Sequence, residues 1–420
     1  ICGWDKSKQT IKLKKSQIRN MATPQTLYAY YREALRGVSL PAAYVDLELF
    51  DKNVAAIAQR AGQKKIRVAT KSLRAVPMIR RILAASPQYQ GLMCYAAREA
   101  LWLAEQGFDD LLVAYPTTNV QDIAAVAQAV GAGKRIYLMA DLAEHLQRLE
   151  VQAAAAGVVL PICVDIDLSM PFMGIHFGVH RSSIKNVDDM RRWLDFLATK
   201  CPHLRLAGLM GYEAQIAGLG DRQRGKWLMS RIIAWLQGRS IGQLRERRAT
   251  CVEAIRGAGI SLDFVNGGGT GSLESTREEA VVTEVTAGSG FYSPTLFDQY
   301  SRFRHLPAAG FAVEITRQPK AGVYTCLGGG YVASGAAGVD KVPLPYLPEG
   351  CKLDSNEQCG EVQTPIYYTG AEKLAIGDPV LLRHAKAGEL CERFERLYLI
   401  EKGSITGEAK TYRGEGQCFL

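Results

Sequence analysis

The sequence has no long hydrophobic run and no closely paired cysteines. Its longest uninterrupted apolar stretch, Ala153 to Val164, is well short of the roughly 18 residues that a membrane-spanning helix requires. Residues 1–20 contain no apolar segment of the kind found in a secretory signal. The ten cysteines are scattered without a Cys-x-x-Cys pair, a pattern typical of reduced thiols. We therefore expect a cytoplasmic protein that neither spans a membrane nor depends on disulfides.

Outside the start of the chain, positive and negative charges nearly balance. The 420 residues carry 51 Lys and Arg against 42 Asp and Glu, a net charge of +9, of which +5 lies in residues 1–20. We expect residues 1–20 to lie outside the fold. The basic cluster Arg245, Arg247 and Arg248 has no aromatic residues interleaved with it, and we interpret it as the solvated face of a helix. The composition therefore predicts neither nucleic acid nor a membrane as a partner.

Short apolar runs alternate with segments of helical period from residue 41 to about residue 287. The apolar runs predict eight strands, at 66–71, 91–96, 110–115, 135–139, 160–167, 205–212, 262–266 and 281–286. Helical segments lie between most of them, including 98–106, 120–130, 142–156, 187–200 and a long region at 223–256 that we expect to break near Gly238. Strands separated by helical crossovers form parallel sheets. Eight of them in about 250 residues predict a closed (β/α)8 barrel, of the TIM type, over residues 41–287.

The pattern changes after about Gly288. Helical periodicity fades, and short apolar segments at 311–315, 322–326, 379–383 and 396–400 appear between Gly and Pro residues, with a loop-rich stretch at 342–363. This pattern predicts a second, mainly β domain over residues 288–420. We expect residues 21–40 to pack against it.

Lys71 is the first candidate for chemistry, because it ends the first predicted strand in the segment Arg67-Val-Ala-Thr-Lys71-Ser. In a (β/α)8 barrel, reactive groups project from the C-terminal ends of the strands. A lysine amine that loses hydration becomes neutral more readily, and a neutral amine attacks a carbonyl to form a Schiff base. Taken alone the position is weak support, since most lysines are solvated surface charges.

A glycine-rich run, Asn266-Gly-Gly-Gly-Thr270-Gly-Ser272, follows the seventh predicted strand. Its glycines let the backbone approach an anion, and successive N–H groups with the Thr and Ser hydroxyls can donate hydrogen bonds. In isolation the run is equally consistent with a flexible turn. Barrels commonly hold a phosphate after strands seven and eight, so its position favours an anion site. A Schiff-base lysine and a phosphate loop together describe pyridoxal phosphate.

The chain resembles the fold-type III pyridoxal phosphate enzymes, which have alanine racemase-like barrels, and within them the D-threonine aldolase and D-serine dehydratase group. The resemblance covers nearly the whole chain after Met21. It is carried by the Lys71 segment, the glycine-rich run and four further segments, Pro41-Ala-Ala-Tyr-Val-Asp46, Gly208-Leu-Met-Gly-Tyr212-Glu-Ala-Gln215, Val282-Thr-Glu-Val-Thr-Ala-Gly-Ser289 and Arg383-His384-Ala-Lys386.

The resemblance implies a role for individual residues. It implies that Lys71 is the cofactor lysine and that Gly268, Gly269 and Thr270 cradle the phosphate. Tyr212 is implied to line the cofactor, with a core aromatic role as the alternative. Arg181 could face the cofactor or the substrate carboxylate, or it could form a surface ion pair.

The chain departs from the family at the expected metal site. Metal-dependent relatives use a His-x-Cys or His-x-Asp pair for a divalent ion such as zinc or manganese, whereas Lys386 stands at the second position after His384. Cys391 could complete a site with His384 only if the loop folds back. The alternative is that the Lys386 ammonium supplies the positive charge that a metal would supply. His176 and His180 have the spacing of ligands on a helix, but Gly174 and Gly178 indicate a loop and a structural role.

The resemblance implies a pyridoxal phosphate-dependent lyase for β-hydroxy amino acids, of D configuration. Lys71 would remove the α-proton for dehydration to a 2-oxo acid and ammonia, with a group near His384 protonating the leaving hydroxyl. Retro-aldol cleavage to glycine and an aldehyde is the other outcome. The alternatives are an amino acid racemase and a non-catalytic carrier of the cofactor. The racemase would need a second base, commonly a Tyr from the second domain of the partner chain, for which Tyr292 or Tyr331 are the candidates. A homodimer is also implied.

Overall fold

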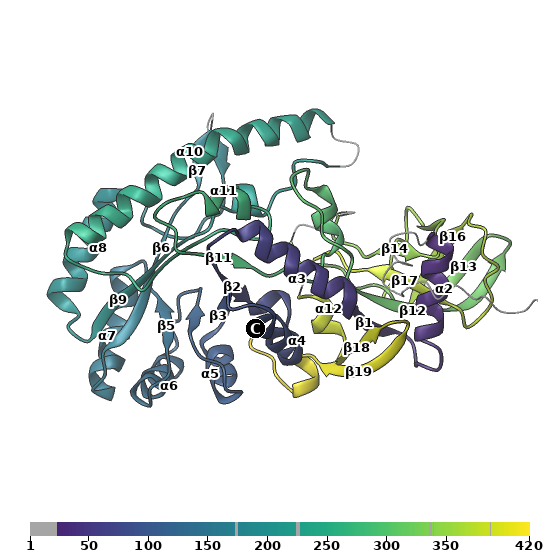
Figure 1. Ribbon diagram of the computed structural model, residues 1–420, viewed down its shortest axis with the longest axis horizontal. Helices are drawn as coiled ribbons and strands as arrows, with labels where there is room; N and C mark the ends of the chain where they lie inside the picture. Colours follow the sequence, from purple (N-terminus) through teal and green to yellow (C-terminus); the bar gives the residue numbers. More distant parts are fainter. Residues whose placement is uncertain (1–22, 173–174, 224–226, 336–337, 339, 387) are drawn as a thin grey trace, which may run out of the picture.

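Eight parallel strands of the computed structural model close into a barrel, shown at the left of Figure 1. The structure describes residues 23–172, 175–223, 227–335, 338, 340–386 and 388–420, so residues 1–20 lie outside the described part. Around the barrel the strands run β10 (Phe264–Gly267), β11 (Glu284–Ala287), β2 (Lys65–Ala69), β3 (Tyr89–Cys94), β4 (Leu111–Val113), β5 (Ile136–Met139), β6 (Leu160–Ile166) and β9 (Leu204–Gly211). Pairing of β9 with β10 closes the ring. The predicted (β/α)8 barrel is confirmed.

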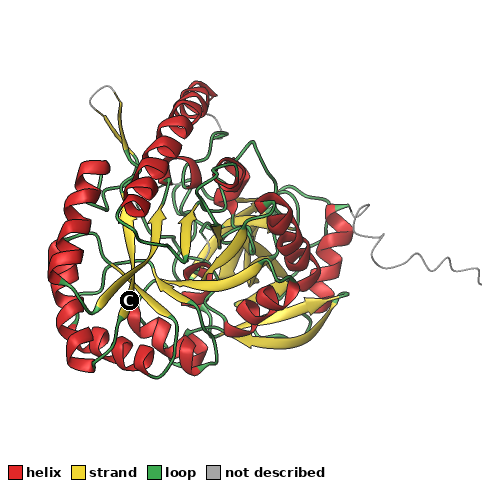
Figure 2. Ribbon diagram, turned by 60° about the vertical axis from the view of Figure 1, so that its left-hand side comes forward, coloured by secondary structure: helices red, strands yellow, loops and turns green. Residues whose placement is uncertain are grey.

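Helices pack around the outside of the barrel, as Figure 2 shows. They are α3 (Leu47–Ala61), α4 (Val76–Ala85), α5 (Ala97–Glu105), α6 (Val120–Gly131), α7 (Ala143–Ala156), α8 (Val187–Lys200), α10 (Trp227–Gly257) and α11 (Leu273–Arg277). Helix α10 is continuous over 31 residues, so the predicted break near Gly238 is wrong. A glycine costs a helix interior only about 1 kcal/mol, and α10 buries Ile233, Leu244, Val252 and Ile255 against the barrel.

A buried network of charged and polar groups crosses the barrel interior. The Arg67 guanidinium donates to both carboxylate oxygens of Glu284, at 2.6 and 3.0 Å, and to Asp110 Oδ1 at 2.8 Å. Glu284 Oε1 also accepts from Asn266 Nδ2 at 2.8 Å. Buried charges are stable only when they are paired and hydrogen-bonded, and this network satisfies that condition while it fixes the orientation of the Asn266 amide.

A nine-stranded sheet forms the second unit, at the right of Figure 1. Its main path is β15 (Cys351–Leu353), β16 (Gln363–Tyr368), β13 (Val323–Leu327), β12 (Ala309–Lys320), β1 (Ala42–Asp46), β18 (Arg396–Glu401) and β19 (Ser404–Lys410), with β14 (Leu344–Leu347) and β17 (Pro379–Arg383) paired off it. Strand β1 joins this sheet although it precedes the barrel in sequence. The stretch at 342–363, predicted to be loop-rich, contains β14 and β15.

Short elements complete the two units. They are the hairpin of β7 (Met170–Phe172) and β8 (Ile175–Phe177), the short helices α9 (Ala214–Ala217) and α12 (Leu390–Arg393), and the 3-10 turns η2 (Thr70–Ser72), η3 (Thr295–Gln299) and η4 (Arg413–Glu415). Helix α2 (Pro24–Ala34) lies against the sheet, where the Tyr28 hydroxyl donates to the Pro379 carbonyl at 3.0 Å. This contact places helix α2 against the second sheet; residues 21 and 22 lie outside the described residues.

The second unit reaches the mouth of the barrel beside Lys71. Both the Cys391 thiol and the Tyr292 hydroxyl donate to the Leu73 carbonyl, at 3.1 and 3.2 Å. Gly388 lies so close to the Lys71 turn that a β-carbon added to it would stand 2.0 Å from the Lys71 carbonyl oxygen. Gly388 therefore packs directly against the backbone of the candidate catalytic lysine.

Within the described ranges, no helix combines the length and the apolar composition needed to cross a membrane.

Candidate active site

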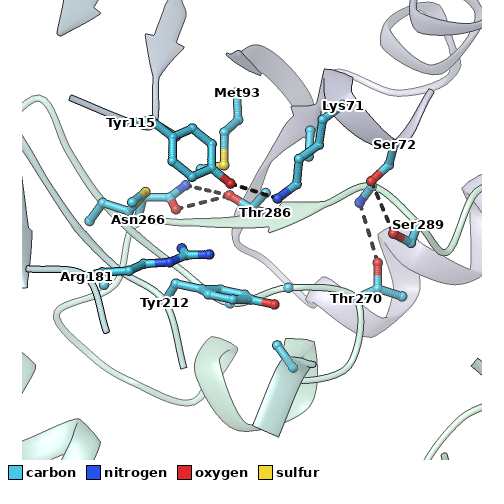
Figure 3. A pocket seen from close by; sticks show the side chains of 18 of the residues that line it. Lys71, Ser72, Met93, Tyr115, Arg181, Tyr212, Asn266, Thr270, Thr286 and Ser289 are labelled. Carbon is cyan, nitrogen blue, oxygen red and sulfur yellow. Dashed lines mark hydrogen bonds between the residues drawn. The ribbon is translucent and has the colours of Figure 1, made fainter. Parts of the chain in front are cut away.

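A cavity lies at the C-terminal ends of the barrel strands, and Figure 3 shows its lining side chains. The structure brings five of the site residues predicted from sequence to this one cavity, namely Lys71, Tyr212, Gly268, Gly269 and Thr270. Arg181 also lines it, together with residues that the sequence reasoning did not single out, among them Tyr115, Asn266, Thr286 and Ser289.

Lys71 enters the cavity from the 3-10 turn η2, immediately after β2, and not from the strand itself. The turn is held by the Thr70 hydroxyl, which donates to the Met93 carbonyl at 2.9 Å on the neighbouring strand. Lys71 Nζ donates to the Tyr115 hydroxyl at 2.9 Å, as the dashed line in Figure 3 marks. The lysine amine is therefore fixed against a phenol that can exchange a proton with it.

Tyr115 follows β4 and stands between two cationic groups. Burial raises the pKa of Tyr115, but the Lys71 ammonium outweighs it with help from Arg181, and the net result is a lowered pKa. A phenol with a lowered pKa gives up its proton more readily near neutral pH. Tyr115 is thus placed to hold or release a proton at the Lys71 amine.

Arg181 and Tyr212 form the wall opposite Lys71 in Figure 3. The Arg181 guanidinium lies 5.6 Å from the Tyr115 ring centre and 5.0 Å from that of Tyr212, within cation–π range. Burial raises the pKa of Tyr212 to about 12, with Arg181 opposing the rise, so its phenol stays protonated. Among the described residues Arg181 has no carboxylate within ion-pair distance; its charge acts on Asp165, and its side chain lines the cavity.

The glycine-rich loop rests on a buried acidic side chain from the end of β9. Glu213 accepts hydrogen bonds from the Gly268 N–H at 3.2 Å and from the Ser272 hydroxyl at 3.1 Å. Arg248 pairs with Glu213 at 3.0 Å and is fully buried. The interpretation of Arg248 as part of a solvated helix face is therefore wrong, because its charge is needed under the loop.

Thr270 joins this loop to the segment that follows β11. Its hydroxyl oxygen accepts from the Gly288 and Gly290 N–H groups at 3.5 and 3.2 Å. Within the described ranges, the N–H groups of Thr270 and Gly271 donate to no acceptor. Donors without partners beside a cavity fit an anionic ligand.

Close packing explains why glycines occupy several positions around the cavity. A β-carbon on Gly269 would lie 3.0 Å from the Ala217 β-carbon, and one on Gly288 would lie 2.8 Å from the Ser72 hydroxyl oxygen. Gly268 has a φ of +83°, in the region that side chains rarely adopt. The loop, its unpartnered donors and the Lys71 amine across the cavity together fit pyridoxal phosphate, as predicted from the sequence.

The inner face of the cavity carries neutral polar groups. The Asn266 amide and the Thr286 hydroxyl are hydrogen-bonded to each other at 2.9 and 3.0 Å. Since the Glu284 carboxylate can only accept, the Asn266 atom that faces it must be the amide nitrogen, and this orients the whole pair. A hydroxyl–amide pair held by mutual hydrogen bonds thus faces the cavity.

His384 and Lys386 follow β17, Cys391 lies in α12, and none of the three lines the cavity. Burial, and then Arg383, lower the pKa of His384 to about 3, so its ring is neutral. Neither His384 ring nitrogen has a hydrogen-bond partner among the described residues. Lys386 is exposed, and its Nζ donates to the Ser334 hydroxyl at 2.9 Å.

The described part of the chain contains no cluster of three His, Cys, Asp or Glu side chains that could hold a metal ion. His176 and His180 stack on each other with ring centres 3.8 Å apart. His176 lies on strand β8 and Gly178 after it has a φ of +143°, so the two histidines do not stand on a helix, and the predicted loop is a strand at His176. The catalytic and metal-binding roles assigned from the sequence remain proposals.

Asp165, on β6, is a buried carboxyl beyond Arg181. Burial raises its pKa from an ordinary value near 3.8 to about 8, Arg181 opposes the rise, and Asp141 and Asp167 add to it. Its Oδ1 atom has no hydrogen-bond partner within the described ranges. A carboxyl in these surroundings favours the protonated form in the folded protein.

Between about pH 4 and pH 8, the free energy of unfolding of the parent protein is expected to fall as pH rises. Asp165→Asn is expected to abolish the part of this fall that Asp165 causes. In this window the folded state binds more protons than the unfolded state, so the free energy of unfolding falls with rising pH. The fall should exceed about 1.4 kcal/mol, the equivalent of one pKa unit. Urea unfolding of both proteins across this range measures it, and equal pH slopes for the two would contradict the assignment.

Sequence reasoning missed Tyr115, Thr286 and Asp165. Each lies at or near the C-terminal end of a strand, which is where a barrel places its reactive groups. Their positions at the predicted strand ends could have been noted, but a single polar residue at a strand end does not form a recognisable motif.

Comparison with known proteins agrees with this geometry. A family model described as the alanine racemase N-terminal domain matches residues 45–295. The chain is 24% identical over 274 residues to D-threonine aldolase from Arthrobacter sp., which is 65% of this chain and 65% of that protein. The matched segment is thus just under two thirds of the length of that relative.

Two solved structures share the fold. The crystal structure of D-threonine aldolase from Filomicrobium marinum superposes with a TM-score of 0.74 at 18% identity, over 90% of this chain and 96% of that one. D-threo-3-hydroxyaspartate dehydratase from Delftia sp. HT23 superposes with a TM-score of 0.72 at 19% identity, over 90% and 98% of the two chains. With its barrel, its cavity and the match over residues 45–295, the chain belongs to the alanine racemase N-terminal domain family.

Proposed function

We propose that the chain is a pyridoxal phosphate-dependent lyase acting on β-hydroxy amino acids of D configuration. One observation carries the proposal: Lys71 and the glycine-rich loop at Gly268, Gly269 and Thr270 line the same cavity at the C-terminal mouth of the barrel. The relatives support the substrate class, since they are named for aldol cleavage of D-threonine and for dehydration of D-threo-3-hydroxyaspartate.

Pyridoxal phosphate, when bound, supplies a ring that accepts electrons from bonds at the substrate α-carbon. Lys71 and the loop would hold it at its two ends. The Arg181 guanidinium is proposed to bind the substrate carboxylate, because it lies in the cavity without a carboxylate partner among the described residues. The side chains of Tyr115 and Tyr212 flank this cation and limit the directions from which an anion can approach it.

Lys71 is proposed to take the α-proton at Nζ, and Tyr115 to take part in its protonation through the 2.9 Å hydrogen bond. If the β-hydroxyl then leaves, the products are a 2-oxo acid and ammonia. If a base removes the β-hydroxyl proton instead, the bond between the α- and β-carbons breaks and gives glycine and an aldehyde. We favour the first outcome, dehydration.

His384 and Lys386 are proposed to serve the β-hydroxyl, the neutral imidazole as a hydrogen-bonding partner and the Lys386 ammonium as the positive charge that a metal supplies in other members. The contact of Gly388 with the Lys71 turn places this part of the chain beside the backbone of the proposed catalytic lysine, and neither the His384 nor the Lys386 side chain lines the cavity. A divalent metal held by His384 and Cys391 is the alternative.

The racemase alternative requires a second base facing Lys71. Tyr292 is fully buried, its hydroxyl donates to the Leu73 carbonyl, and burial raises its pKa strongly. Tyr331 packs against Phe311 and Phe394 in the second unit. Neither tyrosine lines the cavity of this chain, so in a racemase one of them would have to reach Lys71 from the second domain of a partner chain.

A homodimer is proposed for the assembly. The first turns of α10 present large apolar side chains to solvent, with Trp227, Leu228 and Trp235 each more than half exposed. Contiguous exposed apolar surface is typical of protein–protein contacts.

Incubation with D-threonine, D-serine and D-threo-3-hydroxyaspartate, followed by assays for 2-oxo acid, glycine and the L isomer, tests the proposal. We expect a 2-oxo acid from at least one of them, and activity that persists in the presence of a chelator. Glycine as the main product would indicate the aldolase, and interconversion of isomers would indicate the racemase. A protein that binds pyridoxal phosphate but converts none of them would be a carrier.

A further inference from the structure

Arg60 is a partly buried arginine outside the cavity that touches the glycine-rich loop from behind. It lies in the last turn of α3, with a side chain only 12% exposed. Its Nη2 atom donates to the Thr270 carbonyl oxygen at 2.7 Å and to Glu274 Oε2 at 2.9 Å, and its Nε donates to Glu274 Oε1 at 2.5 Å. The planar guanidinium thus binds a carboxylate with two parallel hydrogen bonds and the loop with a third.

Two further groups fix the guanidinium. It stacks on the Phe303 ring, with 3.8 Å between the guanidinium carbon and the ring centre. Its Nη1 atom lies 2.7 Å from His305 Nε2. Burial, and then the charge of Arg60, lower the pKa of His305 to about 3, so the ring is neutral and its Nε2 accepts the hydrogen bond. The Arg60 guanidinium is therefore fixed by Glu274, Phe303 and His305 in addition to its hydrogen bond with the loop.

The geometry of the peptide bond transmits this contact to the loop. In a trans peptide, the carbonyl of one residue and the N–H of the next point in opposite directions. Because Arg60 holds the Thr270 carbonyl on the outer side, the Gly271 N–H points away from Arg60. That N–H donates to no acceptor within the described ranges.

We propose that Arg60 is a positioning residue for the phosphate cradle: by holding the Thr270 carbonyl outward, it aims the Gly271 N–H at the cofactor phosphate. The inference rests on the proposed function and adds a residue that contacts neither cofactor nor substrate. Under this proposal Arg60 affects the binding only of a ligand that carries a phosphate group.

The test compares the affinity of the apoprotein for pyridoxal phosphate and for pyridoxal, which lacks the phosphate. Absorbance titrations are carried out with the parent protein and with Arg60→Lys, which keeps the charge but loses the planar fork. We expect the dissociation constant for pyridoxal phosphate to rise about tenfold, the equivalent of one charge-assisted hydrogen bond, and that for pyridoxal to change less than twofold. Glu274→Gln, which loosens Arg60 without touching the loop, should show the same selectivity to a smaller degree, and it replaces Arg60→Lys if that variant does not fold.

Arg81→Lys is the matched control. Arg81 makes the same two-bond contact with Asp51, also on α3, at 2.7 and 2.6 Å, but on the surface and away from the loop. It should change neither affinity. If Arg60→Lys weakened the binding of pyridoxal phosphate and of pyridoxal equally, Arg60 would have a merely structural role and the inference would be overturned. Unchanged affinities for both ligands would also overturn it. A parent protein that binds neither ligand would instead overturn the proposed function, and the inference with it.

Discussion

Replacement of Lys71 by alanine is expected to lower turnover by on the order of 10³-fold or more, because the substitution removes the group proposed to take the α-proton. The visible absorbance of the bound cofactor should disappear at the same time, since Lys71 is the amine that lines the cavity opposite the glycine-rich loop. Steady-state kinetics and an absorption spectrum of the purified variant measure both effects.

Lys65→Ala is a suitable control for this substitution. Lys65 begins the same strand, β2, at the opposite end of the barrel, where its Nζ donates to the Pro87 carbonyl at 3.3 Å. It should leave the spectrum and the turnover unchanged. A Lys71→Ala protein that kept the cofactor absorbance would refute the assignment of Lys71.

Replacement of Gly388 by alanine is expected to lower turnover about 100-fold, the effect of a displacement of roughly 1 Å at a reactive group. The new β-carbon would stand 2.0 Å from the Lys71 carbonyl oxygen, where atoms that are not bonded cannot approach. Because that oxygen belongs to the backbone, the turn that carries Lys71 must move. The measurement is of turnover together with the cofactor spectrum.

Gly377→Ala separates this effect from backbone strain. Gly377 has a φ of +90° and Gly388 a φ of +89°, but a β-carbon on Gly377 would meet nothing within 4 Å. Both variants should lose about 1 kcal/mol of stability because alanine is disfavoured at positive φ, and Gly388→Ala should lose more because of the contact with the Lys71 carbonyl. Only Gly388→Ala should lose activity, so equal turnover in the two variants would show that Gly388 does not position Lys71.

The barrel could be predicted because its periodicity is local. Apolar runs such as 160–167 and amphipathic segments such as 187–200 carry their own signal, and the structure places β6 and α8 at nearly these bounds. The predicted break near Gly238 is wrong because tertiary burial along α10 outweighs the local preference of a glycine. The buried state of Arg248 was equally hidden, since its partner Glu213 lies 35 positions away in the sequence.

The cavity was only partly predictable for the same reason. Lys71 and the glycine-rich loop belong to short motifs, whereas Tyr115, Thr286 and Arg60 matter only through neighbours that are distant in sequence. Arg60 and Thr270, for example, are 210 positions apart. No pattern along the chain links them, and the closure of the barrel brings them together.

The most direct test of the central claim, that Lys71 holds pyridoxal phosphate, is chemical trapping. The purified protein is reduced with borohydride, digested, and its peptides are mapped by mass spectrometry. The account predicts a pyridoxyl group on the single peptide that contains Lys71, and none in Lys71→Ala. Modification of another lysine, or of none in a protein with cofactor bound, would contradict it.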